Sequence, residues 1–351
     1  MDHRRLVSIA AGVASVLTLA ACGAGSDSAG PSITFMSGGG AYGDALRDAF
    51  LTPYAEEEDV KVVEDPTLSY AKIETQVRAD EVTIDVVPAE GYWSVQQCGE
   101  VLQPLDTDIV DLSGVDPTLV QDECGAPLLT YSTAIYYNTD TYPQDGPDTC
   151  QEFFDTETYP GTRSVRSSPL PNPLIECALL ADGVPPDELY PLDLDRAFDM
   201  IAEIKDDLVF WEAGSDSETQ MASGEVDIIM AWNGRAYAAV AAQDAPFAGG
   251  EGESLLIYDA LVVPKGVDDP DAVMELIDSM MQPERQATLA TLIPYSPSVV
   301  DAELTDLPED LKPFLPETNP AMAEGTIVQD QQWWAENGQT VTDRWQSELV
   351  Q

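Results

Sequence analysis

Short apolar runs alternate with segments of helical periodicity along the first part of the chain. Strands are expected at 33–36, 60–63 and 84–87, and helices at 43–54 and 70–79. In the helical segments apolar residues recur three or four positions apart, which places them on one face. This alternation favours an α/β fold with parallel strands and packed helices. Ligands of such sheets lie beyond the carboxyl ends of the strands, so the loops that start at Ser37 and Pro88 are expected to line a site.

The rest of the chain carries further elements in a less regular order. Strands are expected at 131–137, 226–232 and 255–263, and helices at 174–180, 193–207, 270–281 and from 283 onward. Asp269 and Pro270 supply an N-cap and a first-turn proline for one of these helices. The segment 144–173 is rich in proline and is expected to be a loop. The runs 131–137 and 293–297 are candidates for segments that cross between two lobes.

Length and charge restrict the class of protein. The chain has 351 residues, and single cores stop growing near about 250 to 300 residues, so two lobes are expected. Fifteen Lys plus Arg stand against 64 Asp plus Glu, a formal net charge of -49. Nucleic-acid binding is excluded, because phosphate contacts need clustered cations. Salt must screen the self-repulsion of so acidic a chain, and we expect a salt-adapted protein.

The first residues have the layout of an export signal. Two arginines precede an uncharged apolar stretch at 6–19, which is too short for a full membrane span. The stretch ends in Leu-Ala-Ala-Cys, which resembles a bacterial lipobox with Cys22 as the lipidated residue. We therefore expect a lipoprotein signal at 1–21 and a flexible tether at 22–31 that holds a body at the outer membrane face. The sequence leaves open whether export follows the Sec or the Tat route.

The counts of histidine and cysteine limit the chemistry further. His3 is the only histidine, so a chain without its signal has no Ser-His-Asp triad and no histidine-ligated zinc. We expect no metal and no cofactor. Four cysteines follow the lipobox, and an even number in an exported chain favours two disulfides with three possible pairings. We expect Cys98 with Cys124 and Cys150 with Cys177, because near-neighbour closure keeps each bridge in one lobe; a site of four thiolates is the alternative.

Several short motifs together resemble the spermidine/putrescine-type solute-binding proteins of ABC importers. They are GGGAY at 38–42, YYNTD at 136–140, LYPLD at 189–193, GEVD at 224–227, AWNGR at 231–235, YDALVVPKG at 258–266 and WW at 333–334. The resemblance implies a two-lobed α/β periplasmic-binding-protein fold of type II, a Venus flytrap in which each lobe is a mixed sheet flanked by helices. It implies a monomer without enzyme activity that closes on a small solute and delivers it unaltered to ABC permease subunits. The expected lobes are 32–139 plus 257–295 and 140–256 plus 296–351.

The resemblance also implies ligand contacts. Trp232 matches an aromatic residue that packs against ligand methylenes, and Asp259 matches an acid that pairs with an amine. Further candidates near family positions are Tyr42, Glu90, Tyr92 and Glu176. Ile257 stands where the family has a tryptophan, so the agreement is uneven. A polyamine such as putrescine or spermidine is the leading ligand.

Two alternatives remain open. The backbone N–H groups around Gly39 could cradle an anion, and Arg163 or Arg235 in the cleft would select a ligand with a carboxylate, so a carboxylate or zwitterionic solute is the first alternative. The second comes from another class: a secreted hydrolase that works through paired carboxylates or through Ser69 and Lys72, which match an S-x-x-K motif.

Overall fold

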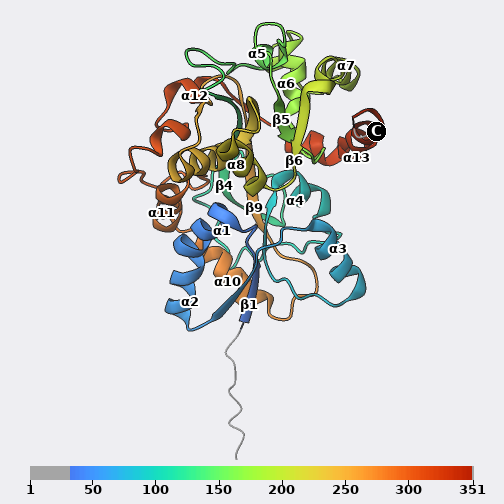
Figure 1. Ribbon diagram of the computed structural model, residues 1–351. Coiled ribbons are helices and arrows are strands. Elements are labelled where there is room, and N and C mark those ends of the chain that lie inside the picture. Colours follow the sequence, from blue (N-terminus) through green and yellow to red (C-terminus); the bar gives the residue numbers. More distant parts are fainter. Residues whose placement is uncertain (1–31, 350–351) are drawn as a thin grey trace, which may run out of the picture.

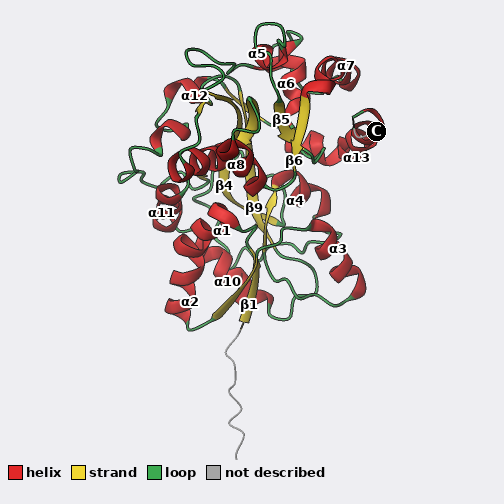
Figure 2. Cartoon of the chain, in the orientation of Figure 1, coloured by secondary structure: helices red, strands yellow, loops and turns green. Residues whose placement is uncertain are grey.

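The protein has two lobes in a computed structural model that describes residues 32–349 (Figure 1). The expected signal at 1–21, the tether at 22–31 and the lipidation site at Cys22 lie outside the described residues. No helix within 32–349 has the length and apolar character needed to cross a membrane. Strands occupy the middle of the molecule and helices surround them (Figure 2), which confirms the expected two-lobed α/β fold of type II.

The lobe at the bottom of Figure 1 is built around two parallel strands, β1 (Ser32–Met36) and β2 (Lys61–Asp65). Its helical segments are α1 (Gly40–Leu46), a π-helical segment (Arg47–Leu51), α2 (Thr52–Glu58), α3 (Tyr70–Ala79), α10 (Pro270–Met280) and α11 (Pro283–Leu292). Phe35, Leu46 and Phe50 are fully buried in one hydrophobic cluster. The apolar faces expected from the spacing thus form the core of this lobe.

A mixed sheet of nine strands runs through the rest of the molecule in the order β11-β9-β4-β7-β5-β6, with β3 on β9 and with β8 and β10 on β4. Its strands are β3 (Val87–Glu90), β4 (Gly125–Asn138), β5 (Arg163–Arg166), β6 (Leu208–Trp211), β7 (Ile228–Trp232), β8 (Phe247–Gly249), β9 (Ser254–Val262), β10 (Ser296–Pro297) and β11 (Thr326–Val328). β5 is parallel to β6 and β7, whereas β4 is antiparallel to β7 and β9. The sheet is therefore mixed rather than purely parallel.

The antiparallel strands β4 and β9 connect the two lobes. Their pairing runs from Gly125 opposite Val262 to Thr133 opposite Leu255. At one end β3 adds to β9, and at the other end β4 continues alongside β7 and β8. Figure 1 shows both strands passing from the lower into the upper half of the molecule. A rotation of one lobe against the other would act on this pair of strands, which we call the crossing strands.

The upper lobe carries most of the remaining helices. They are α5 (Cys150–Phe154), α6 (Pro173–Ala181), α7 (Leu194–Ile204), α8 (Gly214–Ser223), α9 (Asn233–Tyr237), α12 (Pro320–Glu324) and α13 (Gln331–Glu348), with a π-helical segment (Ala238–Ala242) and 3₁₀ turns (Pro186–Glu188, Lys205–Asp207, Lys312–Phe314). In α7 the buried side chains of Phe198, Ile201 and Ile204 share one face, as expected from their spacing. α4 (Gly91–Gln97) packs against α13, and the Tyr92 N–H donates to Gln331 Oε1 at 2.9 Å.

Two disulfides confirm the expected pairing. Cys98 is bonded to Cys124 and Cys150 to Cys177, with Cα–Cα distances of 5.5 and 5.1 Å. Because all four thiols are used in these bonds, the alternative of a four-thiolate metal site is wrong. The bridges close loops of 26 and 27 residues, and such loops stabilise the folded state by about 3 kcal/mol each in the chain-entropy account.

Two expectations about the elements are wrong. Of the strand expected at 84–87, Val86 forms a parallel bridge with Phe35 of β1, but the strand itself lies later, at Val87–Glu90, and pairs antiparallel with β9. Pro88 therefore lies within a strand, and the site wall begins at the end of that strand, with Glu90. The segment 144–173, expected to be a loop, contains the helix α5 and the strand β5. This segment is rich in proline, and β5 has only four residues, two of which are arginines, so the strand was not recognised in the sequence.

Candidate functional site

Asp259 lies on the crossing strand β9, between the two lobes. Its side chain is 8% exposed and accepts a hydrogen bond of 2.8 Å from the Tyr42 hydroxyl. Burial raises the pKa of Asp259 to about 7, with a further contribution from the nearby Glu90 carboxylate, while the bond from Tyr42 opposes this rise. A cation placed beside Asp259 would restore its charge, so this position favours an ammonium group.

Tyr42 reaches Asp259 because α1 starts directly after three glycines. Gly38, Gly39 and Gly40 have φ values of 71°, 62° and 58°, in the left-handed region that residues with a Cβ rarely adopt. This turn brings α1 close to the upper lobe, where the Arg235 Nη2 donates to the Gly39 carbonyl at 3.5 Å. The glycine loop therefore forms one wall of the space between the lobes.

An ion pair joins the lobes next to Asp259. Glu90 ends β3, Arg166 ends β5, and the Arg166 Nη1 donates to Glu90 Oε1 at 2.6 Å. The Glu90 side chain is 6% exposed and that of Arg166 16%. The Arg166 guanidinium also lies over the Trp232 ring, 5.2 Å from its centroid, which is a cation–π distance. Trp232 ends β7, so the carboxyl ends of two parallel neighbours, β5 and β7, contribute to one site.

Aromatic rings fill the space between these charged groups. The ring centroids of Tyr42 and Tyr295 are 5.7 Å apart, those of Tyr295 and Tyr131 are 5.5 Å apart, and those of Tyr131 and Trp232 are 5.8 Å apart. The three tyrosines are buried. Such a group of rings suits the methylenes of a short aliphatic ligand, and its edges carry the hydroxyls that face the carboxylates.

A second buried guanidinium lies near Trp232, since a Cβ on Gly214 would contact both side chains. Arg235, in α9, is 4% exposed and pairs with Glu218 of α8 at 2.7 Å. A Cβ on Gly40 would lie 2.7 Å from the Arg235 Nη1, and a Cβ on Gly214 would lie 2.5 Å from its Nε. Glycine is therefore required on both sides of this arginine. The Nε atoms of Arg166 and Arg235 are both buried and have no hydrogen-bond partner within residues 32–349.

The structure brings most of the candidate residues together, and Glu176 lies apart from them. Gly39, Tyr42, Glu90, Trp232 and Asp259 surround the space between the lobes. Tyr92 lies two residues after Glu90, in α4, and is buried in the hydrophobic cluster that also contains Trp93 and Trp334. Burial and then the nearby Glu90 carboxylate raise the pKa of its hydroxyl, so Tyr92 lies at the edge of the same site.

Glu176 lies in a different environment. It is fully buried in α6, and its Oε1 accepts hydrogen bonds from Tyr190 at 2.6 Å, Trp334 at 2.7 Å and Gln329 at 2.9 Å. None of these partners is a residue around Asp259, so the hydrogen bonds of Glu176 tie α6 to the carboxyl-terminal part of the chain.

Three other candidates have structural partners. Arg163 is fully buried and donates to the backbone carbonyls of residues 153, 159 and 161 at 2.5 to 2.8 Å. Ser69 caps α3 by accepting from the Lys72 N–H at 3.3 Å, and the Lys72 ammonium pairs with Asp65. The side chains of Ser69 and Lys72 do not bond to each other within the described chain, so the dyad required by the hydrolase alternative is not formed.

Sequence reasoning missed Arg166, Tyr131 and Tyr295. Arg166 was hidden because β5 was expected to be a loop. Its signal was the short run at 163–166, which pairs with Ile228 and Ile229 of a strand that was expected. Tyr131 and Tyr295 were interpreted only as parts of crossing segments, which gives no indication of the face to which their rings point.

Comparison with known proteins places the chain in a family. The family model for bacterial extracellular solute-binding proteins matches residues 49–323. The gamma-aminobutyric acid (GABA)-binding protein of Pseudomonas aeruginosa is 29% identical over 337 residues, which cover 89% of each chain. The solved structure of the Atu4243 GABA receptor is 32% identical, with a TM-score of 0.79 over 90% of this chain and 96% of the other. The spermidine/putrescine-binding periplasmic protein of Escherichia coli is 22% identical over 261 residues, 70% of this chain and 72% of that protein.

These relatives refine the expectation from the motifs. The binding-protein family and its fold are confirmed, while the polyamine-type proteins are only distant relatives. A solved ABC transporter substrate-binding protein from Bradyrhizobium japonicum is 31% identical, with a TM-score of 0.83 over 91% of this chain and 99% of the other. The relatives are binding proteins rather than enzymes, and the family is extracellular. This chain belongs to the bacterial extracellular solute-binding protein family, the substrate-binding components of ABC transporters.

Proposed function

We propose that this protein captures a small zwitterion with an ammonium group and a carboxylate at opposite ends of a short aliphatic chain, such as GABA. One observation carries the proposal: buried acids and buried arginines surround the same group of aromatic rings. Asp259 and Glu90 lie on one side, and Arg166 and Arg235 lie beside Trp232. The names of two relatives, a GABA-binding protein and a GABA receptor, support this choice.

The ammonium end of the ligand is assigned to Asp259. This carboxyl accepts from the Tyr42 hydroxyl at 2.8 Å, with the Tyr131 hydroxyl also close, and burial raises its pKa to about 7. A buried carboxylate becomes favourable when a cation neutralises it. An ammonium in this place would also lie near the Glu90 carboxylate, whose effect on the pKa of Asp259 shows that the two acids are close.

The carboxylate end is assigned to the arginines beside Trp232. Each has a buried Nε–H without a partner, and an unpaired buried donor costs about 1 to 3 kcal/mol. A ligand carboxylate accepts hydrogen bonds from guanidinium groups in a fork geometry and would remove this cost. The methylenes between the two ends would lie against the rings of Tyr131 and Trp232.

The same arginines weaken the polyamine hypothesis. A diamine such as putrescine would place a second ammonium where Arg166 and Arg235 lie, and like charges in a buried site repel strongly. Two carboxylates, Glu90 and Glu218, partly compensate for these guanidinium groups. A polyamine thus remains the competing ligand in the test.

The ligand must enter an open form, because the residues around Asp259 are buried. The pairs Glu90–Arg166 and Gly39–Arg235 join the two lobes in the closed form. Contacts that exist only in the closed form allow a ligand to shift the population toward it. We propose that the ABC permease recognises this closed form and that the lobes comprise 32–139 plus 257–295 and 140–256 plus 296–351.

The amino-terminal sequence supports a second element of the proposal. We infer that residues 1–21 direct export and that Cys22 is lipidated, so that a monomeric, salt-adapted body is held at the outer face of the membrane. A Cys22→Ala variant expressed in a lipoprotein-processing host should lose metabolic labelling with palmitate and should leave the membrane fraction. Labelling that persists in the variant would contradict this inference.

Calorimetric titration in molar salt tests the ligand. GABA should bind, whereas butylamine and butyrate, which each lack one charged end, should bind at least about 100-fold more weakly, because a buried charge then stays unpaired. Arg166→Gln, Arg235→Gln and Asp259→Asn should each weaken GABA binding. Arg196→Gln is the matched control, since Arg196 forms an exposed ion pair with Asp182. Tight binding of putrescine together with no binding of GABA would overturn the proposal.

A further inference from the structure

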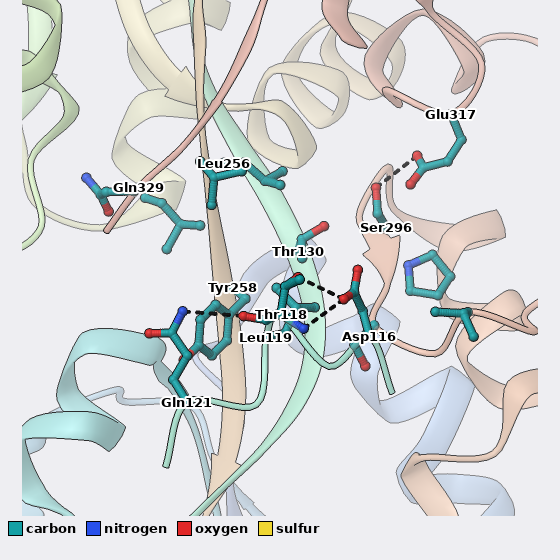
Figure 3. Close-up of a pocket in the computed structure, with 15 residues that line it drawn as sticks. Asp116, Thr118, Leu119, Gln121, Thr130, Leu256, Tyr258, Ser296, Glu317 and Gln329 are labelled. Atoms are coloured by element: carbon teal, nitrogen blue, oxygen red, sulfur yellow. Dashed lines mark hydrogen bonds between the residues drawn. The ribbon is translucent and has the colours of Figure 1, made fainter. Parts of the chain in front are cut away.

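A cavity lies on the face of the crossing strands that points away from Asp259. Along β9, neighbouring side chains point to opposite faces, so Asp259 faces Tyr42 while Tyr258 faces the other way. On β4, Thr130 pairs with Tyr258 and lies on that same rear face. Both residues line a cavity of about 460 Å³, shown in Figure 3, which we call the hinge cavity. This volume is within the range of small-molecule sites.

Both lobes contribute walls to the hinge cavity. One wall comes from the loop at 116–121, which belongs to the lobe that contains 32–139. The other wall comes from β11, which pairs with Leu256 at the end of β9 that enters the upper lobe. A rotation that separates the lobes in front of the crossing strands must bring these rear walls together. The hinge cavity is therefore a property of the closed form.

The walls combine apolar surface with acceptors and contain no cation. Apolar lining comes from Leu119, Leu256, the Tyr258 ring and Val328, which is 64% exposed. The fifteen lining residues include no Lys, Arg or His. A ligand carboxylate would therefore find no partner here, unlike in the space around Arg166.

The polar part of the lining is acidic. Glu317 accepts from the Ser296 hydroxyl through Oε2 at 2.9 Å, and Asp116 accepts from Thr118 through Oδ1 at 2.8 and 2.9 Å. The second oxygen of each carboxylate has no partner within residues 32–349. Figure 3 shows both acids on the side of the cavity that carries Ser296, with the Thr130 hydroxyl close by. These acceptors suit a group that only donates, such as a primary ammonium.

We propose that the hinge cavity binds a small aliphatic monoamine, with its ammonium between Asp116 and Glu317 and its chain against Leu256 and Tyr258. Because the cavity exists when the lobes are closed, an amine bound there stabilises the closed form. By linkage it strengthens binding of the solute in front of the crossing strands, and the solute strengthens binding of the amine by the same factor. An amine in the hinge cavity would thus increase the fraction of the closed form that the transporter recognises.

Titration of the full chain with n-hexylammonium chloride in molar salt tests this proposal. Binding should be saturable, and sodium hexanoate should not bind. Glu317→Gln should weaken amine binding about two- to fivefold, since the ammonium loses a charge partner that is exposed to solvent. Val328→Trp, at an exposed rim position, should block the cavity, and Val63→Trp, at an exposed position of β2, is its control. Circular dichroism melting curves establish that each variant is folded.

Two further measurements separate this site from the space around Asp259. Asp259→Asn should leave hexylammonium binding unchanged, and saturating amine should lower the radius of gyration measured by small-angle X-ray scattering. Absence of saturable binding would overturn the proposal. Hexylammonium binding that is abolished by Asp259→Asn and preserved in Val328→Trp would also overturn it. A radius of gyration that does not change at saturating amine would do the same. None of these outcomes depends on whether GABA is the solute.

Discussion

The pKa of Asp259 predicts a steep pH dependence of ligand binding. Burial and the Glu90 carboxylate raise this pKa to about 7, so near neutral pH the carboxyl is half protonated in the closed form without ligand. A bound ammonium favours the ionised form, and binding must therefore release the proton. The sign follows directly: affinity for GABA is highest above pH 7 and falls as the pH is lowered through 7.

The size of this effect follows from the same value. We take Asp259 to be ionised in the complex. The apparent Kd then equals the Kd at high pH multiplied by 1 + [H⁺]/Ka, where Ka is the acid dissociation constant of Asp259 without ligand. With a pKa of about 7, lowering the pH from 8 to 5 should weaken binding about 90-fold, which corresponds to about 2.7 kcal/mol. Calorimetric titrations across this range, in buffers with different ionisation enthalpies, measure both the affinity and the protons released.

Two variants complete this test. Asp259→Asn should remove the pH dependence and weaken binding at pH 8 by about 2 to 5 kcal/mol, because the ammonium loses a buried charge partner. Asp148→Asn is the control: burial raises the pKa of Asp148 to about 6 as well, but its carboxylate accepts from the backbone N–H of Gly250, away from Asp259. A Kd for GABA that stays constant from pH 8 to 5, or a pH profile that Asp259→Asn leaves intact, would refute the reasoning.

Two more predictions concern the glycine loop and its neighbour. Tyr42→Phe removes a hydrogen bond that lowers the pKa of Asp259, so the midpoint of the pH profile for GABA should move upward, as the same titrations can show. Gly40→Ala places a Cβ 2.7 Å from the Arg235 Nη1 at a φ of 58°, and should weaken GABA binding as well as lower the melting temperature. Gly99→Ala has a φ of 80° and open space around the added Cβ, so it should lower only the melting temperature; an equal loss of affinity in both variants would contradict this role of Gly40.

Much of the fold could be predicted where local chemistry marks the ends of elements. Asp269 accepts a hydrogen bond from the Ala272 N–H, and Pro270 occupies the first turn, so these two residues were sufficient to predict the start of α10. The helix expected at 70–79 has the same bounds in the structure, with Ser69 as its cap. The strand β5 could not be recognised in this way, because four residues in a proline-rich segment carry too little periodicity.

The convergence of side chains at the site is a tertiary property and was harder to predict. The resemblance of motifs identified Trp232 and Asp259 as candidates, and the structure places them around one group of rings. The choice of a polyamine followed from the resemblance to spermidine/putrescine-type proteins, in which Asp259 matches an acid that pairs with an amine. Arg166 adds a positive charge to the site and so favours a ligand with a carboxylate. Its position depends on which strand ends are neighbours in the sheet, and the periodicity of a single sequence does not contain that information.

Glu176 provides a last prediction that separates a structural role from a binding role. Burial raises the pKa of Glu176 in the folded protein, although Tyr190, Trp334 and Gln329 donate hydrogen bonds that oppose the rise. An acid with a raised pKa contributes stability that is fully present below its unfolded pKa and is lost as the pH rises through its folded pKa.

Glu176→Gln should therefore raise the free energy of unfolding at pH 8 relative to the unsubstituted protein, and the difference should vanish below pH 4. The amide oxygen can keep the three hydrogen bonds, whereas the unpartnered Oε2 is replaced by an equally unpartnered NH₂ group. Glu176→Ala leaves all three donors unsatisfied and should be destabilising at every pH. Urea unfolding at several pH values measures these energies. Because none of the partners of Glu176 surrounds Asp259, Glu176→Gln should leave the Kd for GABA unchanged; a large loss of affinity would instead place Glu176 among the ligand contacts.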